Sequence, residues 1–526
     1  MNIKDEYREN KGAFDKVCAK GEITMKTVLE YLEKTVLNHS DKTAVIDEKS
    51  SVTYSQLEER SKRAGSFLSE KTDINKPIII FAEKGIDALC SFFASAYAGC
   101  FYTLADPHLP AERLAVIQFI LGAETVITNE KNYDLAKTVF PSLQIFKAEE
   151  MQTAPVNEKR LSQIRAEITD TMPLYVNFTS GSSGVPKGVA VSHRSVIDFI
   201  NTFCDTFNIN GNDIIGNQAP FDFDVSVKDI YSAMKTGATL VIIPREYFSK
   251  PTELMDFIVE HNMTTLIWAV SALSLINTFH ILDYKTPETV NKILFSGEVM
   301  PLKHLKDWQK HLPNAMFVNL YGPTEITCNC TYHIIDNSRE YDSAVPIGKA
   351  FDNEKVFLLD AENKEVKEHG AVGEICVGGT ALALGYYNNA EQTKKAFVQN
   401  PLCPAYIDMI YKTGDLAKYD ENGDLVFCGR KDFQIKYMGH RVELEEIEKE
   451  IMKIDEVEKT CCIFDTEKKR LFAFYIGNID RRELHKKLKD KLPLYMIPNA
   501  LRKIDSMPLT KNGKTDRKAL MEGETR

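Results

Sequence analysis

Residues 179–188 combine the side chains of this chain that are best suited to holding a phosphate. They read Thr-Ser-Gly-Ser-Ser-Gly-Val-Pro-Lys-Gly and follow an apolar run at 174–176 that predicts a strand. Glycine permits close approach and unusual dihedrals, so such a loop can turn N–H groups and hydroxyls onto an anion. Lys187 adds a point charge. A glycine follows this lysine, so the segment is not a Walker A loop, and a plain flexible turn is the alternative interpretation.

Residues 319–325 place an aromatic ring and a carboxylate at the end of another predicted strand. They read Asn-Leu-Tyr-Gly-Pro-Thr-Glu. In a parallel sheet, ligands bind beyond the carboxyl ends of the strands. Tyr321 offers a flat face for an adenine, and Glu325 offers the oxygen ligand that Mg²⁺ prefers. Taken alone, the segment is equally consistent with an ordinary strand-to-turn junction.

Three later segments carry further polar groups. Asp415 follows a Thr-Gly turn and can accept hydrogen bonds from both ribose hydroxyls, although an exposed turn aspartate is the commoner arrangement. The strings 429–436 (Gly-Arg-Lys-Asp-Phe-Gln-Ile-Lys) and 439–448 (Gly-His-Arg-Val-Glu-Leu-Glu-Glu-Ile-Glu) are long and specific. Lys514 follows an Asn-Gly turn near the end of the chain and is predicted to lie at its tip.

The elements that must position these groups alternate between strands and helices. Strands are predicted at 77–82, 100–104 and 125–128, with helices at 85–98 and 111–121 between them. The same rhythm returns as strands at 239–243, 265–268, 292–295 and 316–319. This pattern predicts an α/β fold, in which a large N-terminal domain of parallel and mixed sheets with flanking helices spans residues 1–431. A shift in composition near Asp432 predicts a small C-terminal α+β domain over residues 432–526, which carries Lys514.

Bulk properties narrow the function class. A chain of 526 residues is long enough for two or more domains. The net charge of -10 argues against a uniformly basic, nucleic-acid-binding surface. The 11 cysteines have no zinc-like spacing and suit a reducing cytoplasm. No apolar run is long enough for a membrane span, and the first residues lack the apolar core of a signal peptide, so we expect a cytoplasmic protein.

Together these strings, from 53–57 to 508–518, follow the order found in adenylate-forming enzymes. Over nearly its whole length the chain resembles this superfamily of acyl-CoA synthetases, luciferases and amino-acid adenylation domains. Segment 217–231 resembles most closely the adenylation domains of nonribosomal peptide synthesis and the D-alanine–carrier-protein ligases. In these enzymes the residue at the position of Asp224 pairs with the substrate's ammonium group. Burying an ammonium group without a partner is costly, which agrees with that role.

The resemblance implies an ATP- and Mg²⁺-dependent ligase that converts an amino acid into aminoacyl-AMP and pyrophosphate. The resemblance also implies that this ligase then transfers the aminoacyl group to the phosphopantetheine thiol of a carrier protein in trans. The implied catalytic residues are Lys514, Glu325 and Thr324, with Glu325 as the metal ligand. Asp432 is the implied hinge, about which the mobile small domain withdraws Lys514 and brings in the loop at Gly439. The implied nucleotide-binding residues are Thr179, Ser180, Gly181, Ser182, Ser183, Gly184, Lys187, Gly297, Glu298, Asn319, Leu320, Tyr321, Gly322, Pro323, Asp415, Phe427 and Arg430.

The implied substrate pocket leaves the amino acid open. Trp268 and Leu320 are bulky, so we expect little space, as alanine or serine would need. Lys228 departs from the D-alanine ligases and can either pair with an acidic substrate such as aspartate or extend outward to solvent. Chirality stays open. The pocket positions are Asp224, Val225, Lys228, Trp268, Leu294, Ser296, Leu320, Cys328 and Asn329.

Two other functions remain as alternatives. The first is a carboxylic-acid–CoA ligase, although Asp224 argues against it because aryl and fatty acids carry no amine. The second is a nucleotide-binding regulator that retains the fold without the chemistry. No carrier segment is recognised within residues 1–526, so we expect a free-standing enzyme or an excised domain. Lys486, Lys487, Lys489 and Lys491 are a candidate docking face for an acidic carrier helix, or simply a solvated face.

Overall fold

The expected alternation of strands and helices is present in a computed structural model of the protein. The structure describes residues 25–181, 185–341, 344–432, 434–466, 468–508 and 515–524. The predicted helix at 111–121 is α5 (Ala111–Leu121), and the predicted strands at 77–82 and 125–128 are β3 (Pro77–Phe81) and β5 (Thr125–Thr128). Among the described residues, no helix is both long and apolar enough to cross a membrane.

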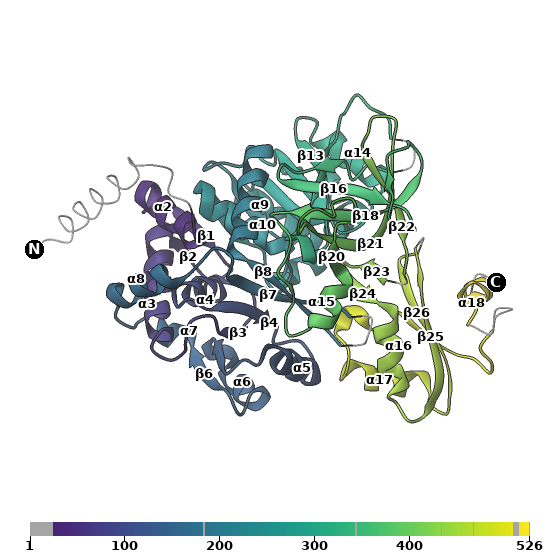
Figure 1. The fold of residues 1–526 in the computed structure, drawn as a ribbon, viewed down its shortest axis with the longest axis horizontal. Coiled ribbons are helices and arrows are strands. Elements are labelled where there is room, and N and C mark those ends of the chain that lie inside the picture. Colours follow the sequence, from purple (N-terminus) through teal and green to yellow (C-terminus); the bar gives the residue numbers. More distant parts are fainter. Residues whose placement is uncertain are drawn as a thin grey trace, which may run out of the picture.

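Two large sheets form most of the large domain (Figure 1). Their central strands are parallel, and antiparallel strands lie at the edges. The nine-stranded sheet runs in the order β15 (Lys349–Ala350), β14 (Thr331–Ile334), β13 (Met316–Tyr321), β12 (Lys292–Ser296), β11 (Thr265–Ala269), β9 (Ile214–Asn217), β10 (Thr239–Ile242), β1 (Thr43–Ile46), β2 (Ser51–Thr53). The seven-stranded sheet runs β19 (Gly385–Tyr386), β8 (Lys187–Ser192), β7 (Pro173–Thr179), β4 (Phe101–Ala105), β3, β5, β6 (Gln144–Lys147).

A layer of helices fills the space between the inner faces of these two sheets. Apolar side chains such as Phe93 of α4, Phe199 of α9 and Ile230 of α10 share one core with strand residues of both sheets. The helices of this layer include α2 (Leu29–His39), α3 (Tyr54–Leu68), α4 (Ile86–Tyr97), α9 (His193–Thr206) and α10 (Val225–Thr236). A second core covers the other face of the nine-stranded sheet with α11 (Pro251–Glu260), α12 (Val270–Thr278) and α14 (Leu302–His311). Helix α5 packs on the outer face of the seven-stranded sheet.

A six-stranded antiparallel sheet completes the large domain and leads into the small one. It contains β17 (Glu365–Val366), β16 (Glu354–Leu359), β18 (Val372–Gly379), β21 (Met409–Tyr419) and β20 (Phe397–Gln399), with β22 (Leu425–Arg430) paired to β21. The short helix α15 (Ala390–Ala396) precedes β20.

The strands and helices after residue 432 pack around apolar clusters of their own. A hairpin of β23 (Gln434–Tyr437) and β24 (His440–Glu443) comes first. A three-stranded sheet of β25 (Val457–Asp465), β26 (Arg470–Gly477) and β27 (Ala500–Lys503) follows. Helices α16 (Leu444–Met452) and α17 (Arg481–Lys489) pack on one face of this sheet, and α18 (Arg517–Glu524) packs on the other.

Candidate active site

The glycine-rich loop connects two antiparallel strands and touches the small domain. Strand β7 ends at Thr179 and β8 begins at Lys187, and residues 182–184 between them lie outside the described residues. Ser180 donates a hydrogen bond to the carbonyl of Arg441 at 2.8 Å. The Gly181 N–H donates to a carboxylate oxygen of Glu446 at 3.1 Å. An N–H group of this loop therefore faces a carboxylate of the small domain in this structure.

A tyrosine at the end of β13, an aspartate in the middle of β21 and an arginine at the end of β22 meet at one point. The Tyr321 hydroxyl donates to Asp415 Oδ2 at 2.6 Å, and Arg430 donates to the other oxygen of the same carboxylate. The ring of Phe427 lies 6.5 Å from that of Tyr321. Gly414 has φ +73°, and a Cβ there would approach Arg430 Nη2 to 2.9 Å, so the turn before Asp415 requires glycine. The structure thus brings together four residues that the sequence assigns to one nucleotide.

Glu325 is fully buried and holds the densest set of polar contacts in this region. Its carboxylate accepts a hydrogen bond from the Tyr386 hydroxyl at 2.7 Å and two from Arg441 Nη1 at 2.8 and 3.0 Å. Burial disfavours the charged carboxylate, but the Arg441 charge and the Tyr386 hydrogen bond outweigh burial and hold the pKa of Glu325 below its ordinary value. Glu325 is therefore an anion that a cation already neutralises.

Arg441 belongs to the small domain, so the β23–β24 hairpin is inserted into the site. The Gly439 N–H at its tip donates to Glu298 Oε1 at 3.2 Å. The Lys436 ammonium lies 5.7 Å from the centre of the Tyr321 ring. The His440 ring stacks on Tyr495 with a centroid distance of 3.8 Å. The small domain therefore presents the loop at Gly439 to the large domain in this structure.

A second group of polar side chains surrounds the start of α10. Asp224 immediately precedes the helix and is 8% exposed. The Cys328 thiol donates to the Asp224 carbonyl at 3.1 Å. Lys228 is fully buried, and its ammonium donates to Asn329 Oδ1 at 2.6 Å. The alternative in which Lys228 extends to solvent is therefore wrong. Burial raises the pKa of Asp224, while Thr324, Lys228 and Lys436 oppose that shift.

Comparison with known proteins identifies the framework that carries these groups. The family model described as AMP-binding enzyme matches residues 32–387. The chain belongs to the AMP-binding enzyme family. It is 32% identical over 504 residues to surfactin synthase subunit 1 of Bacillus subtilis (strain 168). This aligned region covers 94% of this chain and 14% of that protein. It is 30% identical to gramicidin S synthase 1 of Brevibacillus brevis, covering 94% of this chain and 44% of that protein. This AMP-binding enzyme therefore spans less than half of either relative.

Solved structures give the same assignment for the fold. The Vibrio cholerae adenylation domain AlmE, in complex with glycyl-adenosine-5'-phosphate, matches with a TM-score of 0.84 at 21% identity, covering 96% of this chain and 99% of that one. The structure of IdnL1 matches with a TM-score of 0.81 at 25% identity, covering 93% and 100%. This AMP-binding enzyme thus has the fold of an adenylation domain, and the resemblance read from its motifs is confirmed.

The expectation that Trp268 narrows the substrate pocket is wrong. Successive side chains of a strand point to opposite faces. Leu294 and Leu320 point toward α10 and its core, whereas Trp268 pairs in register with Phe295 and lies in the core on the other face. There its indole N–H donates to the Gly216 carbonyl at 2.8 Å. The face of β11 toward α10 instead carries the residues of this strand that alternate with Trp268.

The remaining predicted residues of the AMP-binding enzyme fall into four groups. Asp432, the predicted hinge, accepts two hydrogen bonds from Arg430, at 2.6 and 2.9 Å. Lys187 lies 5.4 Å from the centre of the Tyr386 ring, and burial lowers its pKa. At or just beyond the carboxyl ends of β12 and β13 lie Ser296, Gly297, Asn319, Gly322 and Pro323, and α10 begins at Val225. The residues outside the described part of the chain are Ser182, Ser183, Gly184 and Lys514.

Sequence reasoning missed three contributors to this site. Arg441 and Lys436 lie inside strings that were recognised as specific, but nothing in one sequence shows that their side chains reach the large domain. Tyr386 lies on the two-residue strand β19 and belongs to no recognised motif. Within the described residues, no cluster of three or more His, Cys, Asp or Glu side chains forms a metal centre.

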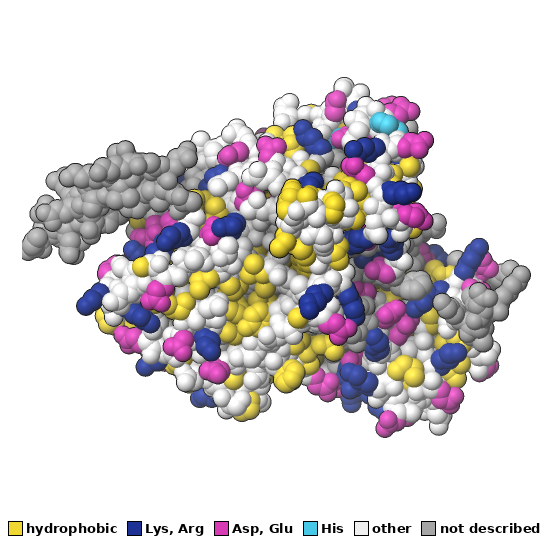
Figure 2. All heavy atoms as spheres, viewed as in Figure 1, with side chains coloured by type: hydrophobic (Ala, Val, Ile, Leu, Met, Phe, Trp, Pro, Cys, Tyr) yellow, Lys and Arg dark blue, Asp and Glu magenta, His cyan; other side chains and the backbone are white. Residues whose placement is uncertain are grey.

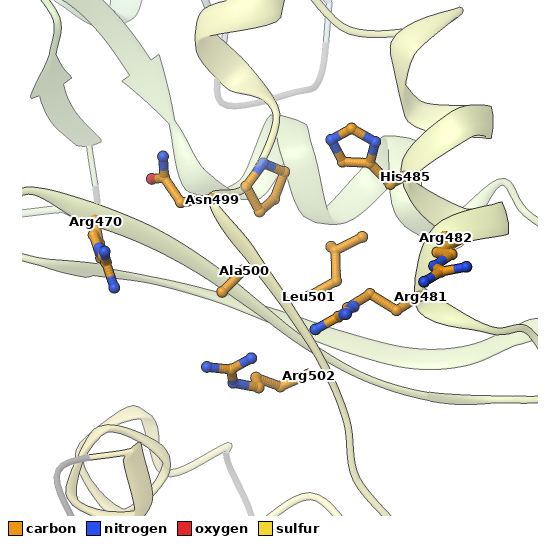
Figure 3. A pocket seen from close by; sticks show the side chains of 9 residues that line it. Arg470, Arg481, Arg482, His485, Asn499, Ala500, Leu501 and Arg502 are labelled. Carbon is orange, nitrogen blue, oxygen red and sulfur yellow. The ribbon is translucent and has the colours of Figure 1, made fainter.

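A separate hollow of about 630 Å³ lies on the small domain (Figure 3). Arg470, Arg481, Arg482 and Arg502 line it together with His485, from β26, β27 and α17. All of its lining residues belong to the small domain, so it is not part of the site between the two domains. Figure 2 shows the same molecule as spheres, with charged side chains of both signs scattered over the visible face.

Proposed function

We propose that this AMP-binding enzyme activates an amino acid and loads it onto a carrier protein. In the first step, a substrate carboxylate oxygen attacks the α-phosphorus of Mg·ATP, giving aminoacyl-AMP and releasing pyrophosphate. In the second step, the phosphopantetheine thiol of a carrier protein attacks the acyl carbon, giving a thioester and releasing AMP. The observation that carries the amino-acid assignment is the buried carboxylate of Asp224 at the head of α10.

Asp224 has the properties expected of an ammonium-binding acid. Burial raises its pKa, which means that the site disfavours its negative charge until a cation approaches. A substrate ammonium group would supply that cation, and its own desolvation would be offset by the carboxylate. An aryl or fatty acid would leave Asp224 without this partner, which favours an amino acid over the substrate of a CoA ligase.

The nucleotide would take positions that the small domain now covers. Arg441 holds Glu325, Glu446 holds the Gly181 N–H, and Lys436 lies over Tyr321. We assign the phosphates to the loop after β7, the adenine to the face of Tyr321 and the ribose to Asp415 and Arg430. Binding of ATP in this way requires the hairpin to leave, so the structure supports an arrangement that serves the second step.

Glu325 is suited to hold Mg²⁺ once Arg441 withdraws. It is a buried carboxylate, and Mg²⁺ typically takes one or two carboxylates together with substrate phosphates. When bound, the ion would neutralise charge on the phosphates during transfer. Thr324, beside Glu325, favours the charged form of Asp224 against the effect of burial and so links the metal ligand to the substrate acid. Lys514 would bridge the substrate carboxylate and the nucleotide oxygens in the first step.

The test is pyrophosphate exchange with a panel of L- and D-amino acids, with aryl and fatty acids as the competing substrates. We expect exchange with an amino acid and its loss, by about 10²-fold or more, in Asp224→Ala, because removal of one partner of a buried charge pair costs about 3–5 kcal/mol. Asp205→Ala is the matched control, because Asp205 is exposed and pairs only with Lys235 in the described structure. Exchange with aryl or fatty acids alone would favour the CoA ligase, and ATP binding without any exchange would favour the regulator.

A further inference from the structure

Lys228 is an ammonium group buried with a neutral partner. Its side chain has no exposed surface, and its nitrogen donates one hydrogen bond, to the Asn329 amide oxygen at 2.6 Å. Among the residues that the structure describes, the Lys228 nitrogen forms no ion pair with a carboxylate, and Asp224 and Asp229 act on its charge only at longer range. An ammonium has three N–H donors, and burying its charge without an anion is expensive. The position therefore has both donors and charge available for an anionic ligand.

The nearest buried acid on the same helix already has another partner. Asp229 Oδ2 accepts a hydrogen bond from the Asn217 side chain at 2.7 Å. Its other oxygen is buried without a hydrogen-bond partner in the described structure, and burial raises the pKa of Asp229 to about 7. Because it makes no ion pair with Lys228, Asp229 does not explain why a lysine is buried here.

Lys228 lies one helical turn beyond Asp224. Asp224 has helical backbone angles, and residues four apart on a helix lie on one face with their Cβ atoms about 5–6 Å apart. Cys328 and Asn329 connect the two from the opposite wall, since one contacts the Asp224 carbonyl and the other contacts Lys228. A ligand whose ammonium group reaches Asp224 would thus direct its side chain along this face toward Lys228.

A charge count of the site points to the nature of that side chain. In the free protein, burial lowers the pKa of Lys228, and the carboxylates of Asp224 and Asp229 oppose that shift. Once a substrate ammonium takes Asp224, a neutral substrate side chain would leave Lys228 with only the Asn329 amide oxygen as a hydrogen-bond partner. A side-chain carboxylate would replace that missing anion. The Tyr175 hydroxyl, also buried without a hydrogen-bond partner in the described structure, is a further donor in this region.

We infer that Lys228 and Asn329 form a subsite for the side-chain carboxylate of the substrate, so that the enzyme activates an acidic amino acid. This inference rests on the amino-acid activation proposed above. It assigns the α-ammonium to Asp224 and the side-chain carboxylate to Lys228, and both aspartate and glutamate are candidates because they differ by one methylene group. Asparagine and glutamine, which match them in shape, are the neutral competitors.

The experiment compares pyrophosphate exchange for aspartate, glutamate, asparagine, glutamine, alanine and serine, in both chiral forms, with the wild type and Lys228→Met. Methionine keeps an unbranched stem of similar volume and removes the charge. We expect the wild type to prefer an acid over its amide by at least about tenfold, and Lys228→Met to lose that preference. Lys228→Arg, which keeps a cation, is expected to retain part of it. Melting temperature and ATP binding report whether each variant is folded.

The possible outcomes separate this inference from the proposed function. Exchange that is best with a neutral amino acid would overturn the acidic subsite and leave amino-acid activation standing. An unchanged acid-to-amide ratio in folded Lys228→Met would overturn the role of Lys228. If Lys228→Met does not fold, the wild-type preference alone decides. Exchange with no amino acid would overturn the proposed function and the subsite together.

Discussion

Arg441 of the small domain donates two hydrogen bonds to Glu325 of the large domain, at 2.8 and 3.0 Å. Glu325 is fully buried, and 14% of the Arg441 side chain is exposed. The Glu325 carboxylate that Arg441 contacts is the one that we assign to Mg²⁺. The guanidinium of Arg441 and a bound Mg²⁺ would compete for the same two carboxylate oxygens of Glu325. The pair therefore couples the position of the small domain to the charge at the nucleotide site.

This coupling predicts that the two half-reactions respond differently to Arg441. In Arg441→Met we expect amino-acid-dependent pyrophosphate exchange to be retained, because Glu325 stays free for Mg²⁺. Carrier loading should fall by about tenfold or more, because the inserted hairpin loses a buried ion pair. Glu325→Gln should instead lower exchange by about 10²- to 10³-fold. An equal fall of both steps in Arg441→Met would contradict the coupling.

Lys514 is predicted to act in the opposite half-reaction. Lys514→Ala should reduce exchange by about 10²-fold or more, because a cation at the transferring phosphoryl group is lost. Transfer from a supplied aminoacyl-adenylate to the carrier thiol should be spared, because that step uses the hairpin at Gly439. Lys511→Ala, three residues earlier, is the matched control. Loss of both steps would argue against two alternating arrangements of the small domain.

His440 predicts a pH dependence of the docked arrangement. Burial, together with the Arg245 charge, lowers its pKa to about 4. An exposed histidine has a pKa of about 6.5. The docked form thus binds fewer protons than the undocked form. The contribution of His440 to docking is fully present above about pH 6.5. Below that pH, its effect on the equilibrium constant for docking falls by about tenfold per pH unit toward pH 4.

The measurement for His440 is the rate of carrier loading between pH 5 and 8 in the wild type and in His440→Phe, which keeps a ring on Tyr495. We expect the decline below pH 6.5 to be shallower in the variant. Burial raises the pKa of Asp222 to about 7, and its protonation acts in the opposite direction, so the difference between the two proteins is the quantity to compare. Identical profiles would remove His440 from this role.

Trp268 is predicted to affect stability and not substrate choice. Trp268→Phe removes the hydrogen bond to the buried Gly216 carbonyl, which should lower the free energy of unfolding by about 1–3 kcal/mol. Denaturant unfolding measures this loss. The order of preference among amino acids should not change, whereas Leu320→Ala, on the face toward α10, should change it. A shift in preference caused by Trp268→Phe would return this side chain to the pocket.

The elements of the large domain could be predicted from the sequence because their signals are local. Apolar runs such as 77–82 and 125–128 became buried strands, and the helix at 111–121 begins and ends where the pattern predicts. The order of the motifs was sufficient to indicate the family, and it placed Tyr321, Asp415 and Arg430 around one position. These features depend on spacing along the chain, which a sequence shows directly.

The tertiary structure decided the features that depend on which surfaces face each other. Trp268 was placed in the pocket by the resemblance alone, and only the packing shows that its side chain lies in the core on the other face of the sheet. The Arg441–Glu325 pair joins residues 116 positions apart, so no local pattern could reveal it. Whether Lys228 reaches solvent or stays buried depends on the wall that Asn329 provides. Sequence determined the chemistry present in the chain, and packing between distant segments decided which charged groups meet.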